Sequence, residues 1–89
     1  MWANLDEVLR ALAHPARRQI LELVRDRELP AGEIVAAVGL APASVSEHLK
    51  VLRKTGLVVM SASGTWRRYR ADPDALRVVA EWIERQSER

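Results

Sequence analysis

Cysteine is absent from this sequence of 89 residues. Its absence excludes disulfide bonds, thiolate metal ligands, a catalytic thiol and a thiol redox switch. Phenylalanine is also absent and tyrosine occurs once, so aliphatic side chains supply most of the 48% of residues that are hydrophobic. The lack of cysteine is consistent with a reducing compartment.

Long hydrophobic runs are missing as well. The longest uncharged stretch, residues 34–46, is much shorter than a membrane span and contains Gly39 and Pro42. Near the N-terminus, Asp6 and Glu7 stand where a signal peptide needs basic residues followed by an apolar run. We therefore expect a cytoplasmic protein with no membrane partner, folded as a single domain over residues 1–89.

Charge of one sign is concentrated in the middle of the chain. The net charge is +2, but residues 41–70 carry six Lys or Arg against Glu47 alone, which gives +5 for that segment. The segments on either side are slightly acidic, with −1 over residues 1–40 and −2 over residues 71–89. A basic centre between acidic ends is typical of a surface that binds a polyanion, although a solvated charged face has the same composition.

The spacing of apolar residues predicts an α+β protein that is mainly helical. Helical periodicity covers residues 3–13, 15–27, 31–38, 42–55 and 73–86. Residues 57–62 and 66–71 are β-prone and flank a turn that contains Gly64, which predicts a hairpin. Gly39 ends the third helix, and about three residues separate it from the fourth. This order predicts a winged helix-turn-helix, α-α-α-α-β-β-α.

The sequence resembles the ArsR/SmtB family of bacterial winged-helix repressors. The resemblance is carried by residues 12–21, 40–58 and 64–70, and it extends over about residues 5–83. It implies a homodimer that binds a palindromic operator and represses transcription. Residues 41–43 and Glu47 depart from the family pattern, which leaves the operator sequence undetermined.

Metal-sensing members of that family carry Cys-rich, or Asp, Glu and His, ligand sets. Here residues 29–33 hold no Cys or His, the last helix has no His, and the only histidines are His14 and His48. The closer resemblance is to the metal-independent branch, which includes small autorepressors. We expect no metal ion and no cofactor. No catalytic constellation stands out, so we expect no enzymatic activity.

Residues 42–55 form the predicted recognition helix, with Val45, Leu49 and Leu52 on its buried side. The DNA contacts expected on it are Ala43, Ser44, Ser46, Glu47, His48 and Lys50. On the hairpin we expect Arg67 and Arg68 to bind phosphates or to enter the minor groove. The simpler alternatives are that the serines cap the helix and that His48 is a half-buried structural residue. Trp66 is expected to pack at the base of the hairpin and Tyr69 in the core.

The two terminal helices carry more apolar surface than one core needs. In the last helix, Leu76, Val79 and Ile83 form one stripe, and Ala75, Val78 and Trp82 form a second. One stripe can pack on the domain, so we expect the other to join two copies in a homodimer. The interface residues expected are Trp2, Leu5, Val8, Leu9, Val78 and Trp82. The alternative is that a small domain wraps its ends around itself.

The start of the second helix also carries expectations. We expect His14 to cap that helix, and Arg17 and Arg18 to form internal ion pairs. Taken together, the sequence predicts a dimeric DNA-binding repressor whose partners are double-stranded DNA and a second copy. Two alternatives stay open. One is a winged-helix interaction module without DNA binding, favoured by Pro42, Glu47 and the acidic last helix. The other is a sensor with a small-molecule or metal site at the dimer interface.

Overall fold

The computed structural model describes residues 4–88 and has the winged helix-turn-helix architecture that the sequence predicts. One short strand, β1, is added between the second and third helices. In chain order the elements are α1 (Leu5–Leu12), α2 (Pro15–Leu23), β1 (Leu29–Pro30), α3 (Ala31–Val38), α4 (Pro42–Lys54), β2 (Val58–Ser63), β3 (Trp66–Ala71) and α5 (Pro73–Ser87).

The core is aliphatic and draws on every helix. Val8 of α1, Ile20 of α2, Ile34 of α3 and Leu52 of α4 are fully enclosed. Among the described residues the buried polar side chain is Thr55, which follows α4. Its hydroxyl donates to the carbonyl oxygens of Val51 at 3.0 Å and Leu52 at 3.1 Å, so no buried donor is left unpaired at the end of the helix.

The turn between α3 and α4 depends on Gly39. This residue ends α3 with a φ of +70°, a conformation that glycine adopts without a steric penalty, and its N–H donates to the Val35 carbonyl at 3.0 Å. The chain bends by 114° from α3 to α4. Across residues 4–88 no single helix is long and apolar enough to cross a membrane; α3 and α4 meet that description only as a bent pair, by length and composition.

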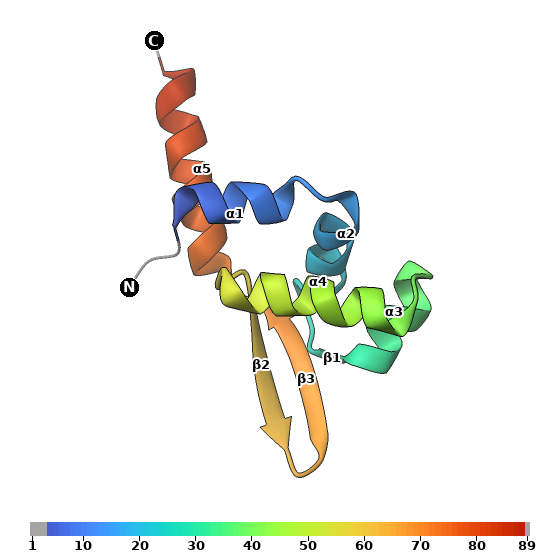
Figure 1. Ribbon diagram of the computed structural model, residues 1–89. Helices are drawn as coiled ribbons and strands as arrows, with labels where there is room; N and C mark the ends of the chain where they lie inside the picture. Colours follow the sequence, from blue (N-terminus) through green and yellow to red (C-terminus); the bar gives the residue numbers. More distant parts are fainter. Residues whose placement is uncertain (1–3, 89) are drawn as a thin grey trace.

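The hairpin of β2 and β3 forms the wing, which projects from the body of the molecule (Figure 1). The strands are antiparallel, with Val58 opposite Ala71 at the base and Ser63 opposite Trp66 at the tip. β1 pairs with the other edge of β3, so the sheet order is β1-β3-β2. At the base, the Ala71 N–H donates to the Val24 carbonyl at 2.9 Å, which fixes the wing to the end of α2.

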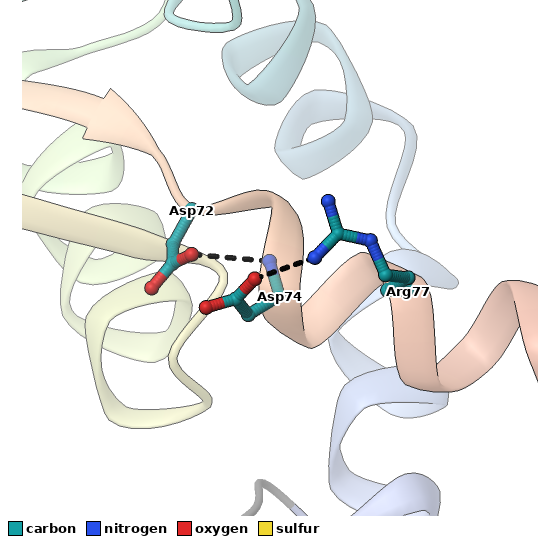
Figure 2. Close-up of polar contacts among 3 residues, drawn as sticks. All are labelled: Asp72, Asp74 and Arg77. Atoms are coloured by element: carbon teal, nitrogen blue, oxygen red, sulfur yellow. Dashed lines mark hydrogen bonds and ion pairs between the residues drawn. The ribbon is translucent and has the colours of Figure 1, made fainter.

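Helix α5 begins with a capped first turn (Figure 2). The Asp72 carboxylate accepts from the Asp74 N–H at 3.0 Å, and Arg77 donates to the Asp74 carboxylate at 2.7 Å. Helix α1 lies across α5 and contacts it, while the C-terminal half of α5 extends beyond the body (Figure 1). Residues 80–88 are all exposed, so only the first half of α5 packs within the chain.

Three details of the predicted fold are wrong. Helix α2 ends at Leu23 and not near Arg27, because the chain turns there to reach β1, a strand that was not predicted. The two apolar stripes predicted for the last helix also do not divide into a buried one and an exposed one. Ile83, assigned to the packed stripe, is 49% exposed because it lies in the half of α5 that leaves the body. Ala75, assigned to the second stripe, is buried.

Candidate nucleic-acid interface

Helix α4 presents polar residues opposite its buried stripe. Val45, Leu49 and Leu52 are buried, as predicted. The structure leaves exposed Ala43, Ser44, Ser46, Glu47 and Lys50. Within residues 4–88 neither serine hydroxyl hydrogen-bonds to the protein. Both hydroxyls are therefore available to a base edge or a phosphate. Both serines lie in the N-terminal half of α4, and this is the half that a recognition helix presents to the bases.

The N-terminus of α4 has no side-chain cap among the described residues. Ala41 stands at the N-cap position, and Pro42 occupies the first turn, where its missing N–H costs no hydrogen bond. The first backbone N–H groups of any helix lack partners within the helix and attract anions. Because nothing in the described chain caps them, this end of α4 favours a nearby phosphate.

His48 links the recognition helix to α2. Its Nδ1 accepts a hydrogen bond from Arg17 Nε at 3.2 Å, and its ring lies 6.1 Å from the ring of His14, with 52° between the planes. Burial of the imidazole lowers the pKa of His48 below its usual 6.5, and the positive charges of Arg17 and His14 lower it further. His48 is half-buried and acts structurally in this contact, while its DNA contact stays a prediction.

At the start of α2 the predicted N-cap position of His14 is confirmed, while the predicted ion pairs of Arg17 and Arg18 are wrong. His14 stands at the N-cap position, but its side chain makes no capping hydrogen bond. Arg18 donates to the Leu12 carbonyl at 2.7 Å, and Arg17 donates to His48. The ion pairs of residues 4–88 lie elsewhere, at Arg25–Asp26 and Arg77–Asp74. Both arginines thus donate to uncharged acceptors, and neither forms an ion pair within the described chain.

The wing carries cations on both of its faces. The strand register places Arg67 and Tyr69 on the face shared with Met60, and Trp66 and Arg68 on the opposite face. Both arginines are exposed, and Tyr69 is half-buried against the core. The two guanidinium groups therefore reach solvent from opposite sides of the hairpin.

Trp66 lies at the tip of the wing and not at its base, where it was predicted. It pairs with Ser63 beside the turn, and 62% of its surface is exposed. Its place in the register could be read from the sequence once the turn was located. Its exposure could not, because tryptophan is usually buried to a large degree.

The cations of the central segment lie on two elements, α4 and β3. They are Lys50, Arg53, Lys54, Arg67, Arg68 and Arg70. All are exposed, and none takes part in an ion pair within residues 4–88. In the same range no group of three or more His, Asp or Glu side chains is placed to hold a metal ion. The arrangement is suited to binding a polyanion along α4 and β3.

The predicted dimer residues have different surroundings. Leu9 and Trp82 are 36% and 39% exposed, and Leu5 and Val78 are half-buried. Val8 is wrong as an interface residue, because it is 0% exposed in the core of its own chain. Trp2 lies outside the described residues. Ile83, at 49%, is an exposed apolar residue that the stripe assignment missed.

Comparison with known proteins agrees with this geometry. The family described as bacterial regulatory protein, arsR family, matches residues 14–59. The chain is 40% identical over 76 residues to the HTH-type transcriptional regulator Rv0081 of Mycobacterium tuberculosis, which covers 83% of this chain and 67% of that protein. It is 25% identical over 79 residues to the transcriptional repressor SdpR of Bacillus subtilis, covering 89% and 88% of the two chains.

Solved structures give the same result. An ArsR-like transcriptional regulator from Rhodococcus sp. RHA1 superposes with a TM-score of 0.84 at 28% identity, covering 93% of this chain and 78% of that one. A homodimeric winged helix-turn-helix DNA-binding domain from Mycobacterium bovis, solved by NMR, superposes with a TM-score of 0.73 at 33% identity. That match covers 94% of this chain and 82% of the other.

Proposed function

This chain belongs to the ArsR family of bacterial regulatory proteins, and on that premise we propose that it is a homodimeric repressor of transcription that binds a palindromic operator. The family makes it a transcriptional regulator with a winged helix-turn-helix DNA-binding domain. The observation that carries the proposal is the exposed face of α4 beside a wing whose cations have no acidic partners in the described chain.

The proposed contacts divide by chemistry. Ala43, Ser44, Ser46 and Glu47 approach base edges, since they lie on the exposed side of the first half of α4. His48 and Lys50 lie further along the helix, near the phosphates. On the wing, Arg67 and Arg68 neutralise the backbone from the two faces of the hairpin. Phosphate contacts set affinity and register, while the contacts from α4 select the sequence.

The proposed dimer joins the exposed apolar side chains of α1 and α5. Leu9, Trp82 and Ile83 leave apolar surface uncovered, and the exposed second half of α5 offers room for a second copy. Two copies related by a two-fold axis present two recognition helices, which is the reason to expect a palindrome. The homodimeric state of the M. bovis domain supports this arrangement.

Repression follows from occupancy of a promoter by this dimer, which excludes the polymerase. The repressor SdpR, which this chain resembles over 89% of its length, supports repression rather than activation. Such a protein meets its DNA in the cytoplasm, and its role needs no catalytic step.

Selection of bound duplexes from a random DNA pool tests the proposal. We expect enrichment of one sequence with two inverted half-sites about one helical turn apart. A Ser44→Ala, Ser46→Ala variant taken through the same selection should enrich that sequence less. Recovery of a single unrepeated half-site would contradict the dimeric reading, and no enrichment over the starting pool would contradict sequence-specific binding.

A further inference from the structure

A groove of about 470 Å³ lies between the start of α3, one side of α4 and the wing strand β3. Its apolar wall is formed by Val35 of α3 with Pro42, Val45 and Leu49 of α4. This volume falls within the range of roughly 300–1,000 Å³ that is typical of small-molecule sites. The size and the apolar wall suit a ligand with a hydrocarbon body.

The polar part of the groove carries one sign of charge. Lys50, Arg53 and Arg67 line it together with the hydroxyl-bearing Ser46 and Tyr69, and no acidic residue does. In the described chain none of these three cations forms an ion pair. Cations held near one another repel, so an anion that enters the groove relieves this repulsion and gains charge-assisted hydrogen bonds.

We propose that this groove binds a small amphipathic anion, a carboxylate carried on an apolar body, as a ligand that controls DNA binding. A DNA phosphate would use the cations but would leave the accessible apolar surface of Val35 and Pro42 without a partner. A carboxylate with a hydrocarbon body uses both parts of the site. The groove shares Ser46, Lys50 and Arg67 with the proposed DNA contacts, so an occupied groove and bound DNA exclude each other. This coupling, unlike the ligand site, rests on the proposed function.

Titration of the full chain with octanoate, followed by amide NMR spectra, tests the site directly. Octanamide has the same apolar body without the charge, and acetate has the charge without the body. We expect octanoate to shift the amides of residues 31–35, 45–50 and 67–69, and to bind at least about tenfold more tightly than either comparison compound. Equal affinity for octanoate and octanamide would overturn the proposal. Shifts confined to the apolar residues of α1 and α5 would also overturn it.

Two variants distinguish binding of octanoate in the groove from nonspecific binding elsewhere on the protein. Gly32 lines the groove, and a Cβ added there meets no atom within 4 Å, so Gly32→Leu places a side chain in open space without breaking the helix. We expect Gly32→Leu and Arg53→Gln each to weaken octanoate binding by about tenfold or more. Arg77→Gln, on α5 and away from the groove, is the control and should bind octanoate as the unmodified chain does. Unchanged octanoate affinity in a folded Arg53→Gln variant would contradict the proposal even if Gly32→Leu failed to fold.

The coupling to DNA has its own readout. Octanoate should lower the DNA affinity of the unmodified chain. It should have little effect on the DNA affinity of Gly32→Leu, which keeps the proposed DNA contacts but binds octanoate weakly. If octanoate binds in the groove and the chain binds no DNA, the proposed function fails and the ligand site stands. If DNA binds and octanoate causes no localised shifts, the ligand site fails and the proposed function stands.

Discussion

The contact between Arg17 and His48 fixes the protonation state of a residue on the recognition helix. Since Arg17 Nε donates to His48 Nδ1, that ring nitrogen has to be free of a proton. Protonation would replace an acceptor with a donor and would place a positive charge beside that of Arg17. The neutral imidazole is thus the form that the folded chain holds.

This contact predicts how stability depends on pH. Burial, followed by the charges of Arg17 and His14, lowers the folded-state pKa of His48 below 6.5, so between the two pKa values the unfolded chain binds more protons. The stabilisation is therefore present above pH 6.5 and is lost as the pH falls through the lower, folded-state value. We expect the free energy of unfolding in urea to decline as the pH falls from about 7 to about 5, with a smaller decline in His48→Gln.

Arg17→Gln is the matched test of this explanation. It removes one neighbouring charge and the hydrogen bond but leaves His48 half-buried, so part of the pH dependence should remain because burial is the larger cause. Curves of equal slope for the unmodified chain and His48→Gln, at one protein concentration, would show that His48 is not the titrating group.

Thr55 gives a second prediction at the scale of one residue. Its hydroxyl satisfies two carbonyl oxygens in the last turn of α4, within the core. Thr55→Val keeps the shape and removes the donor, and should lower the free energy of unfolding by about 1 kcal/mol. Thr55→Ser keeps the donor as the control for the hydrogen bond. Urea denaturation that finds the valine variant as stable as the unmodified chain would show that the hydroxyl contributes nothing.

At the scale of the elements, apolar spacing and glycine positions predicted the helix ends that depend on nearby residues. Helix α3 begins and ends where its apolar spacing and Gly39 placed it, and α4 ends within one residue of the prediction. The strand β1 has only two residues, one of them Pro30, and it exists because it pairs with β3 far along the chain. No pattern within residues 24–30 carries that information, so the end of α2 was misplaced as well.

In the candidate site, too, features set by nearby residues were predicted and features set by long-range contacts were not. The exposed and buried sides of α4 and the alternation along β3 were predicted from periodicity. The half-burial of His48 could be anticipated from its place beside the buried stripe of α4. Its hydrogen bond with Arg17 joins residues that are distant in sequence, so that partner could not be predicted locally. Val8 was misassigned for a related reason, because periodicity identifies an apolar face but not what covers it.

The exposed position of Trp66 at the tip of the wing can be tested by its effect on stability. Trp66 is 62% exposed and pairs only with Ser63 near the turn, so Trp66→Ala should change the free energy of unfolding by less than about 0.5 kcal/mol. Tyr69→Ala, on the face packed against the core, should cost about 1–3 kcal/mol. A large loss of stability in the Trp66 variant would place its indole ring in a packed environment and contradict the position at the tip.

At the scale of the whole molecule, the C-terminal half of α5 does not pack against the rest of a single chain. Trp82→Glu with Ile83→Glu should convert the dimer into monomers, because both side chains are exposed and apolar in the single chain. Light scattering measures the mass, and Glu81→Gln with Glu84→Gln, on the same exposed segment, is the control that should remain dimeric. An unmodified chain that scatters as a monomer at micromolar concentration would contradict the interface.

The central claim is that α4 reads sequence while the wing binds backbone, and salt dependence separates the two roles. Fluorescence anisotropy with the selected duplex and a scrambled one, between about 50 and 200 mM salt, measures both affinity and slope. Arg67→Ala with Arg68→Ala should weaken both duplexes alike and reduce the salt slope by about one unit per arginine. Ser44→Ala with Ser46→Ala should leave the slope unchanged and cost about 1–3 kcal/mol of discrimination. A silent serine pair together with an arginine pair that changes the preferred sequence would contradict the account, because the wing would then be the element that reads the DNA.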